Sequence, residues 1–295
     1  MLKRRLGYHS ASGREMELVL RTATKDYLLN ANFIRWTNLT EGKIAKRYDS
    51  KTGINPFNGT VRAALFQGPP DQRRIYSFGG ASFMHNTSFP GWWIIQSSIN
   101  PLWHLDLDTN VWTPHPTTLT SQPNYGHAAE AVDKGLAFYL NGQTDQGTHQ
   151  NLGYMGNRTQ NLPGMVVINL NNQTFANIST PGLPSETYPR VGGNLQYIPN
   201  IGRSGVLVSL GGAYGNYPNM GRFDSQKLAT FDSVDIFDLD QYLGNPKSNG
   251  SWYSQRCEGD IPPPRIDTCF VLKSAPDNSS HTLYVPFDAC ASENS

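Results

Sequence analysis

The chain has 295 residues and a formal net charge of +1, so its charge gives no reason to expect binding to nucleic acid or to an anionic membrane. The hydrophobic and charged fractions are modest, at 38% and 16%, whereas 28 glycines, 20 prolines and 11% aromatic residues favour many short strands joined by turns. The sequence contains no run of 18 apolar residues, and no apolar signal core follows its basic start. We therefore expect no membrane segment and no signal peptide within it.

The N-terminal quarter of the chain gives weak structural signals. Residues 1–25 predict a poorly determined leader, because they show neither clean strand alternation nor a capped helix. Residues 27–40 predict two short strands that end in Trp36, and they resemble the end of a repeat whose beginning is missing. A polar linker, residues 41–58, follows. We expect the main domain over residues 26–289 and a short tail over residues 290–295.

Three units of four strands follow the linker, each with the same order of apolar runs and turn residues. The first unit is expected to have strands at 61–66, 74–78, 102–107 and around Trp112. Those of the second are expected at 127–132, 136–140, 165–170 and 174–178, and those of the third at 194–198, 205–210, 234–239 and 251–255, with an extra loop at 242–249. A fourth unit begins with strands at 268–273 and 282–285.

Three short motifs recur in these units. A glycine pair ends the second strand, at Gly79-Gly80, Gly142-Gln143 and Gly211-Gly212. An apolar residue, an acid or amide and a leucine end the third strand, and an aromatic residue follows: Leu105-Asp106-Leu107 with Trp112, Ile168-Asn169-Leu170 with Phe175, and Phe237-Asp238-Leu239 with Trp252. The second position of the pair lies 27 residues before the leucine in each unit (80 to 107, 143 to 170 and 212 to 239). Such equal spacing indicates an internal repeat.

At these motifs the sequence resembles the kelch-repeat β-propellers. The residues that match are Gly79-Gly80, Asp106 and Trp112 in the first unit, and Gly211-Gly212, Phe237-Asp238 and Trp252 in the third. The second unit departs from the pattern at Gln143, Asn169 and Phe175. The long inserts, the glycosylation sequons and residues 257–271 are closest to fungal secreted or membrane-anchored kelch-repeat proteins. The resemblance implies an all-β, kelch-type β-propeller of four-stranded antiparallel blades, incomplete here, with three whole blades and partial first and last ones.

The repeated residues are expected to serve the architecture of the blades. A glycine pair allows close approach of backbones and positive φ angles. Trp112 and Trp252 are placed to fill the space between adjacent blades. Asp106 and Asp238 are placed to accept hydrogen bonds from turn amides.

The inserts between the second and third strands are the candidate binding loops. They cover residues 81–101, 144–164 and 213–233, each 21 residues long, and in a propeller they project from one face. Their aromatic residues, together with Asn and Gln, are suited to stacking on sugar rings or to contacting a protein; these aromatics are Phe89, Trp92, Trp93, Tyr154, Tyr214 and Tyr217. The alternative is that these side chains pack down onto the blades.

Two features favour passage through a glycosylating, oxidising compartment. Eight Asn-x-Ser/Thr sequons occur, at Asn38, Asn58, Asn86, Asn157, Asn172, Asn177, Asn249 and Asn278. The three cysteines allow one disulfide, which we expect between Cys257 and Cys269 in a secreted chain, with Cys290 left over. Buried free thiols are the alternative.

Catalytic signatures are weak. The seven histidines show no HxxH or HExxH spacing, and no GxSxG elbow is present. A galactose-oxidase-like copper oxidase, which also uses a kelch-like propeller, would need two histidines, a tyrosine and a tyrosine crosslinked to cysteine at one centre. His127, at the start of an inner strand, could serve as a ligand, but a hydrogen bond at the junction between blades is the simpler expectation.

We therefore expect a non-enzymatic interaction module with no cofactor and no metal, which binds a protein or a cell-surface glycan through one loop-bearing face. An extracellular or cell-surface location follows from the sequons and the resemblance. The alternative is a secreted copper oxidase, or another enzyme, on the same scaffold. Both ends of the chain contain interrupted repeats, so we also expect that further blades lie outside it.

Overall fold

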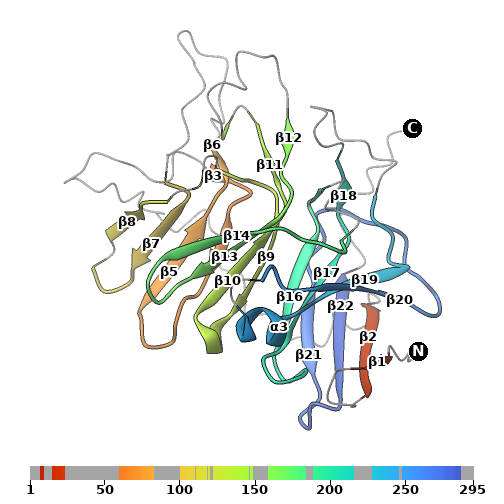
Figure 1. Ribbon diagram of the computed structural model, residues 1–295. Coiled ribbons are helices and arrows are strands. Elements are labelled where there is room, and N and C mark those ends of the chain that lie inside the picture. Colours follow the sequence, from red (N-terminus) through yellow and green to blue (C-terminus); the bar gives the residue numbers. More distant parts are fainter. Residues whose placement is uncertain are drawn as a thin grey trace, which may run out of the picture.

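The computed structural model of the chain describes residues 7–9, 15–23, 60–82, 100–109, 111–117, 119, 122–145, 147–148, 159–183, 189–215, 228–245 and 248–286. Within these residues the fold is nearly all β, with four four-stranded sheets and three two-stranded ones. Figure 1 shows the four-stranded sheets following one another across the molecule in chain order. The expected kelch-type propeller architecture is confirmed at this level, because each predicted unit forms its own antiparallel sheet.

The three predicted units correspond to three blades. Blade 1 is β4 (Ala64–Phe66), β5 (Arg74–Phe78), β7 (Leu102–Asp106) and β8 (Val111–His115). Blade 2 is β9 (His127–Ala131), β10 (Leu136–Leu140), β13 (Met165–Asn169) and β14 (Thr174–Ile178), with a 3-10 turn, η1 (Val132–Lys134). Blade 3 is β16 (Asn194–Ile198), β17 (Val206–Leu210), β19 (Ser233–Asp238) and β20 (Trp252–Arg256). Apart from β4, which is shorter than predicted, and β8, which was predicted only as a strand around Trp112, these strands begin and end within one residue of the predicted bounds.

The fourth sheet differs from the prediction. Its strands β21 (Val271–Ser274) and β22 (Ser280–Pro286) were expected, but β2 (Glu15–Ala23) and β1 (Gly7–His9) were not. β2 pairs in parallel with β22, so the two ends of the described chain share one sheet. The stretch Glu15–Leu18 alternates charged and apolar residues, and two further apolar residues follow, a strand signal that the expectation of a leader did not take into account.

A short helix also lies where a loop was expected. Helix α3 (Leu239–Gly244) begins directly after β19, and the carboxylate of its N-cap residue Asp238 accepts a hydrogen bond from the Asp240 amide. Leu239 and Tyr242 are buried, so one side of the helix packs on the sheets. The insertion therefore lengthens blade 3 without changing its strand order.

The glycine pair of blade 2 is shifted by one residue from its predicted position. Each second strand is followed by two residues with positive φ, and in blade 2 these are Asn141 (56°) and Gly142 (104°). Asn tolerates the left-handed region of the first position, whereas the second position has φ near 90° in all three blades and is always glycine. The distance to the motif leucine is therefore 28 residues in blade 2 (142 to 170) and not 27, and Gln143 begins strand β11.

Short two-stranded sheets follow these positive-φ pairs and carry the long inserts. They are β3 (Thr60–Val61) with β6 (Ala81–Ser82), β11 (Gln143–Thr144) with β12 (Gln160–Asn161), and β15 (Arg190–Val191) with β18 (Ala213–Tyr214). They extend beyond the same end of the blades, at the top of Figure 1. We call this end the loop end. The opposite end, with residues 107–109, 170–173, 239–244 and 275–279, is the turn end.

The hydrophobic core consists of the interfaces between successive blades. Trp252 and Phe237 of blade 3 are buried against Phe138 and Met165 of blade 2, as expected for a tryptophan between blades. Hydrogen bonds also join blade 2 to blade 1, because the Glu130 carboxylate of blade 2 accepts from the amides of residues 67 and 68 at 2.6 and 2.7 Å. Trp112 is half-buried on blade 1.

The expected Cys257–Cys269 disulfide is not formed in the structure. Cys257 is buried in the apolar cluster between blade 3 and the fourth sheet, whereas Cys269 is exposed, and both thiols are free. Burial, with a smaller effect of the nearby Asp232 carboxylate, raises the pKa of the Cys257 thiol to about 11. The alternative, a buried free thiol, is therefore correct for Cys257. Cys290 lies outside the described residues.

Candidate functional site

The predicted binding loops lie largely outside the described residues. Phe89, Trp92, Trp93, Tyr154 and Tyr217 are not described, and only Tyr214 is. The structure does describe the strands from which the inserts start, and these strands gather at the loop end. Tyr214, in β18, is the predicted loop aromatic that the structure places at the loop end.

Four equivalent residues form a chain of backbone hydrogen bonds at this end. They are Arg62, Tyr125, Gly192 and Asp267, each a few residues before the inner strand of a sheet and each with φ between 57° and 65°. The Tyr125 amide donates to the Arg62 carbonyl (3.3 Å), the Gly192 amide to the Tyr125 carbonyl (3.0 Å), and the Asp267 amide to the Gly192 carbonyl (2.8 Å). The four sheets are thus joined through one repeated backbone position, which we call the junction position.

The side chains at the junction position converge as well. The guanidinium carbon of Arg62 lies 4.0 Å from the centre of the Tyr125 ring, a cation–π contact. The Tyr125 hydroxyl donates a hydrogen bond of 2.7 Å to the Asp267 carboxylate. Burial, followed by this hydrogen bond, raises the pKa of Tyr125 far above its ordinary value, so the phenol remains a neutral donor at physiological pH.

The third junction position holds glycine because no larger residue fits there. A Cβ on Gly192 would lie 2.5 Å from Cγ1 of Ile266 and 2.8 Å from the Tyr125 hydroxyl, and its φ of 65° already disfavours other residues. Glycine thus lets the side chains of the neighbouring junctions meet.

A pocket of about 450 Å³ opens beside these junctions. It combines two tyrosine rings, a guanidinium, a carboxylate, two amides and a hydroxyl with an aliphatic floor; its lining is Arg62, Tyr125, Gln143, Thr159, Asn161, Val191, Tyr214, Gly215, Ile266 and Asp267. Gly215 packs directly against Asn161, since a Cβ there would lie 1.3 Å from the amide nitrogen. The predicted residue Tyr214 belongs to this pocket, whereas Arg62, Asn161 and Asp267 were not singled out from the sequence.

A buried polar network lies behind the pocket. Arg190 of β15 donates to the carboxylate of Asp235 (2.7 Å) and to the hydroxyl of Ser209 (2.9 Å), and both charged side chains are almost fully buried. The Arg190 guanidinium also lies 5.7 Å from the centre of the Tyr214 ring. Arg190 therefore connects the core of blade 3 to a wall of the pocket.

His127 completes this network as a junction residue. The Gly193 amide donates to His127 Nε2 (3.1 Å), so the proton of a neutral ring lies on Nδ1, which faces Ser209 Oγ at 3.1 Å. Burial, and then the nearby Arg190, holds the pKa of His127 well below its ordinary value. In this tautomer the ring cannot take a proton from Ser209. The expected junction hydrogen bond is confirmed, and the two residues do not form a nucleophile–base pair.

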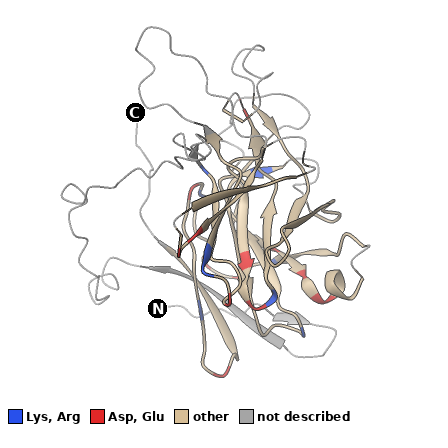
Figure 2. Ribbon diagram, turned by 90° about the vertical axis from the view of Figure 1, so that its left-hand side faces the viewer, with Lys and Arg blue, Asp and Glu red and all other residues tan. Residues whose placement is uncertain are grey.

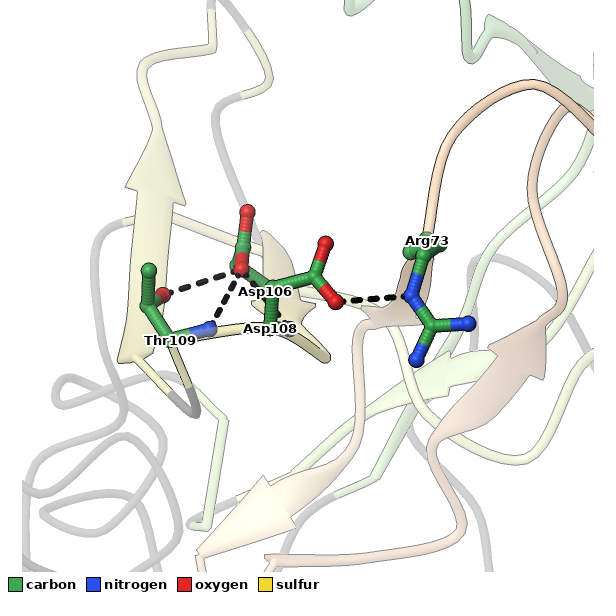
Figure 3. Close-up of polar contacts among 4 residues, drawn as sticks. All are labelled: Arg73, Asp106, Asp108 and Thr109. Atoms are coloured by element: carbon green, nitrogen blue, oxygen red, sulfur yellow. Dashed lines mark hydrogen bonds and ion pairs between the residues drawn. The ribbon is translucent and has the colours of Figure 1, made fainter.

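The turn end uses the acid-or-amide motif for local hydrogen bonds. Asp106 accepts from the Asp108 amide (3.1 Å) and from the amide and hydroxyl of Thr109 (2.8 and 2.9 Å), while Arg73 pairs with Asp108 (2.7 Å), as Figure 3 shows. Hydrogen bonds from Thr109 lower the pKa of Asp106. Asn169 and Asp238 accept the amide two residues ahead in the same way, at 3.0 and 2.9 Å. The predicted role of the acids is confirmed, and it is structural.

Two further histidines, His104 and His115, lie side by side in blade 1. His104 Nδ1 lies 2.6 Å from His115 Nε2, beside the ring of Tyr76. Burial, and then Arg74, lowers the pKa of His104 to about 4, so a positive charge is disfavoured at this pair. Among the described residues no group of three or more His, Cys, Asp or Glu side chains could hold a metal ion. In the same part of the chain no helix is long and apolar enough to cross a membrane.

Comparison with known proteins adds one sequence relative. A protein of the fungus Arthroderma benhamiae, described as a kelch repeat-containing protein, is 24% identical over an alignment of 216 residues that covers 62% of this chain. The chain spans only 30% of that relative. The solved structure of YjhT matches 70% of this chain and 47% of its own, with 14% identity and a TM-score of 0.37. No protein-family model matches the chain.

The sequence relative and the strand order support the same conclusion. The relative is described as a kelch repeat-containing protein of a fungus, and the glycine pairs with the Asp and Trp motif residues had indicated a kelch repeat. Each unit with these motifs is a four-stranded antiparallel sheet whose second strand ends in the positive-φ pair. The predicted resemblance is thereby confirmed: the chain is similar to kelch-repeat proteins and has the blades of a kelch-type β-propeller.

Proposed function

We propose that the chain is a non-enzymatic interaction module that binds a protein segment or a cell-surface glycan at its loop end, outside the cell or at its surface. The observation that carries this proposal is the pocket, because three of the four junction residues line it, together with Val191 beside the fourth. The blades build the same backbone at each junction, yet the side chains there are Arg62, Tyr125 and Asp267. Such variation at a repeated position indicates a role other than holding the blades together.

The chemistry of the lining suits a polar ligand with some flat apolar surface. Asn161, Gln143 and Thr159 can both donate and accept hydrogen bonds, and Tyr214 adds an aromatic surface. A volume of about 450 Å³ is within the range of small-ligand sites and would also hold two or three side chains of a peptide or one sugar residue. Figure 2 shows acidic and basic residues scattered over the described ribbon, so contacts with a partner would depend on shape and hydrogen bonds more than on a large charged surface.

Three pocket substitutions test the proposal. Asn161→Ala removes a donor and acceptor from the lining, Tyr214→Ala removes a ring, and Tyr125→Phe removes the hydroxyl that holds Asp267. The purified full chain and each variant would be measured on a glycan array and, for each glycan or protein found to bind, by surface plasmon resonance. We expect Asn161→Ala and Tyr214→Ala to weaken binding by about tenfold, roughly 1.4 kcal/mol.

Two further variants separate the pocket from other surfaces. Arg256→Ala changes an exposed residue of the outer strand β20 and should leave binding within about twofold. The Trp92→Ala, Trp93→Ala double variant tests the predicted loop aromatics. Unchanged binding in all pocket variants would contradict the pocket, and unchanged binding in the loop variant would contradict the loop aromatics. Stoichiometric copper in the purified protein would favour the oxidase alternative instead.

A further inference from the structure

The sequons in the described part of the chain share one property. Four of the eight lie there, at Asn172, Asn177, Asn249 and Asn278, and all four asparagines are exposed. Asn177 lies within strand β14, where it pairs with Val166, whereas the other three are in turns or irregular segments. Exposed sequons in surface loops are the sites that accept N-linked glycans in secreted proteins.

The three sequons outside strands lie at the same end of the molecule. Asn172 is in the turn from β13 to β14, Asn249 lies between α3 and β20, and Asn278 is in the turn from β21 to β22. The first two of these connections follow third strands that run away from the loop end, and the β21–β22 turn lies opposite the Asp267 junction. Figure 1 shows the β21–β22 turn at the bottom of the molecule and α3 in its lower half, whereas the two-stranded sheets lie toward the top. The pocket and the three sequons are therefore at opposite ends.

Hydrogen bonds orient the side-chain amides of two of these asparagines, Asn172 and Asn278. Asn172 Oδ1 accepts from the hydroxyl and the amide of Thr174, at 2.7 and 3.2 Å, so the hydroxyl residue of the sequon bonds its own asparagine. Asn278 Oδ1 accepts from Asn200 Nδ2 at 3.1 Å. In both cases the bond engages the amide oxygen and not Nδ2, the atom to which a glycan is attached. The turn itself holds the amide group in an accessible orientation.

We propose that Asn172, Asn249 and Asn278 carry N-linked glycans and that these glycans cover the turn end, opposite the pocket. A lipid-linked oligosaccharide diphosphate is the donor. The new bond joins the anomeric carbon of the sugar to Nδ2, the bond from that carbon to the diphosphate oxygen breaks, and the proton lost from Nδ2 neutralises the leaving diphosphate. The modification leaves the pocket uncovered and keeps the exposed turns of the blades from contacting other proteins. This inference rests on the extracellular location in the proposed function, but not on binding at the pocket.

The test uses the full chain secreted from yeast behind a cleavable secretion signal. Glycans would be removed enzymatically in heavy-oxygen water, which converts each occupied asparagine into a labelled aspartate that mass spectrometry detects in peptides. We expect label at most copies of Asn172, Asn249 and Asn278. Label at fewer than two of these three positions in the unmutated chain would overturn the proposal, whatever the variants do.

Variants assign each glycan to its residue. Asn172→Gln and Thr174→Ala both destroy one sequon, the second while retaining the asparagine, and each should remove one glycan step on a denaturing gel. Asn171→Gln is the matched control, since Asn171 is exposed, lies in the same turn and is not in a sequon. A glycan step lost from the control, or retained in both sequon variants, would contradict the assignment to Asn172.

Discussion

The repeated residues form different kinds of hydrogen bond at the two ends of the blades. At the turn end, Asp106, Asn169 and Asp238 each accept the amide two residues ahead, so each of these three motif bonds lies within one blade. At the loop end, the amide and carbonyl of Tyr125 bond to the neighbouring blades, and its hydroxyl bonds to Asp267, which precedes the fourth sheet. The local bond is made by an acid or an amide in every copy, whereas the shared position differs among the copies.

This difference explains where a repeat protein can acquire function. The junction position has the same backbone conformation in four sheets but carries arginine, tyrosine, glycine and aspartate in turn. Because the same backbone bonds join the sheets whichever residue stands there, the side chains can differ from copy to copy and form the pocket. The turn-end residues have no such freedom, since their side chains are the acceptors.

The largest expected effect comes from the buried network behind the pocket. Arg190→Met leaves the Asp235 carboxylate buried without its partner at 2.7 Å, and we expect a loss of about 3–5 kcal/mol in the free energy of unfolding. Urea unfolding followed by tryptophan fluorescence measures it. Arg190→Met combined with Asp235→Leu should recover much of the loss, and Arg256→Met, on an exposed site, should change stability by less than about 0.5 kcal/mol. A loss below about 1 kcal/mol in Arg190→Met would contradict a stabilising loop-end network.

A glycine exchange tests how closely the loop end is packed. Gly212 has a φ of 86°, and a Cβ there would lie 2.7 Å from the Val191 carbonyl and 2.8 Å from the Gly193 nitrogen. We expect Gly212→Ala to cost about 1–3 kcal/mol, because the strained backbone has no room to relax. Gly244→Ala is the control at the turn end, where nothing lies within 4 Å of the added atom. The comparison of the two ends fails if both substitutions have the same effect.

Acid should weaken the loop end before the turn end. The pKa of His127 is held well below 6.5 in the folded chain, so below pH 6.5 the unfolded chain takes up the proton first and stability falls with pH. His104, with a pKa of about 4, acts in the same direction. The pKa of Asp106 is lowered from 3.8, so its bonds fail only at still lower pH. Hydrogen exchange, corrected for intrinsic rates, should therefore speed up at the Gly193 amide between pH 7 and 5 and stay constant at the Thr109 amide. Faster exchange on acidification at the Thr109 amide than at the Gly193 amide would contradict the prediction that acid weakens the loop end first.

Much of this fold could be predicted from sequence because its signals are local. Strand alternation and turn residues identify the strands of blades 1 to 3, ten of the twelve within one residue of their bounds. The parallel pairing of β2 with β22 could not be predicted, since nothing local encodes a partner at the other end of the chain. The glycine pair of blade 2 was predicted one residue too late, because its first position holds Asn141 in the left-handed conformation and the prediction expected glycine there.

The pocket was only partly predictable. Tyr214 was singled out as an aromatic residue in an insert, but Arg62 and Asp267 precede the inner strands and resemble ordinary polar residues of a linker. Aligning the units on the start of the inner strand brings Arg62, Tyr125 and Gly192 into one column, two residues before the strand, whereas Asp267 lies four residues before β21. What the sequence could not give is their convergence, which depends on the angle between blades. The prediction of a Cys257–Cys269 disulfide was wrong for a similar reason, because packing of the sheets buries Cys257 and leaves Cys269 exposed.

The smallest expected effect is an exchange between copies at the turn end. Asp238 accepts the Asp240 amide at 2.9 Å as the N-cap of α3, and Asn169 performs the equivalent task in blade 2 with an amide oxygen. We expect Asp238→Asn to change the free energy of unfolding by less than about 0.5 kcal/mol, because Asn and Asp are equally good N-caps. Asp238→Ala removes the acceptor and should cost about 1 kcal/mol. Thermal and urea unfolding of the two variants would measure the difference. If Asn were as damaging as Ala, the charge and not the hydrogen bond would be the property that the turn end requires, and the acid and the amide would not be interchangeable there.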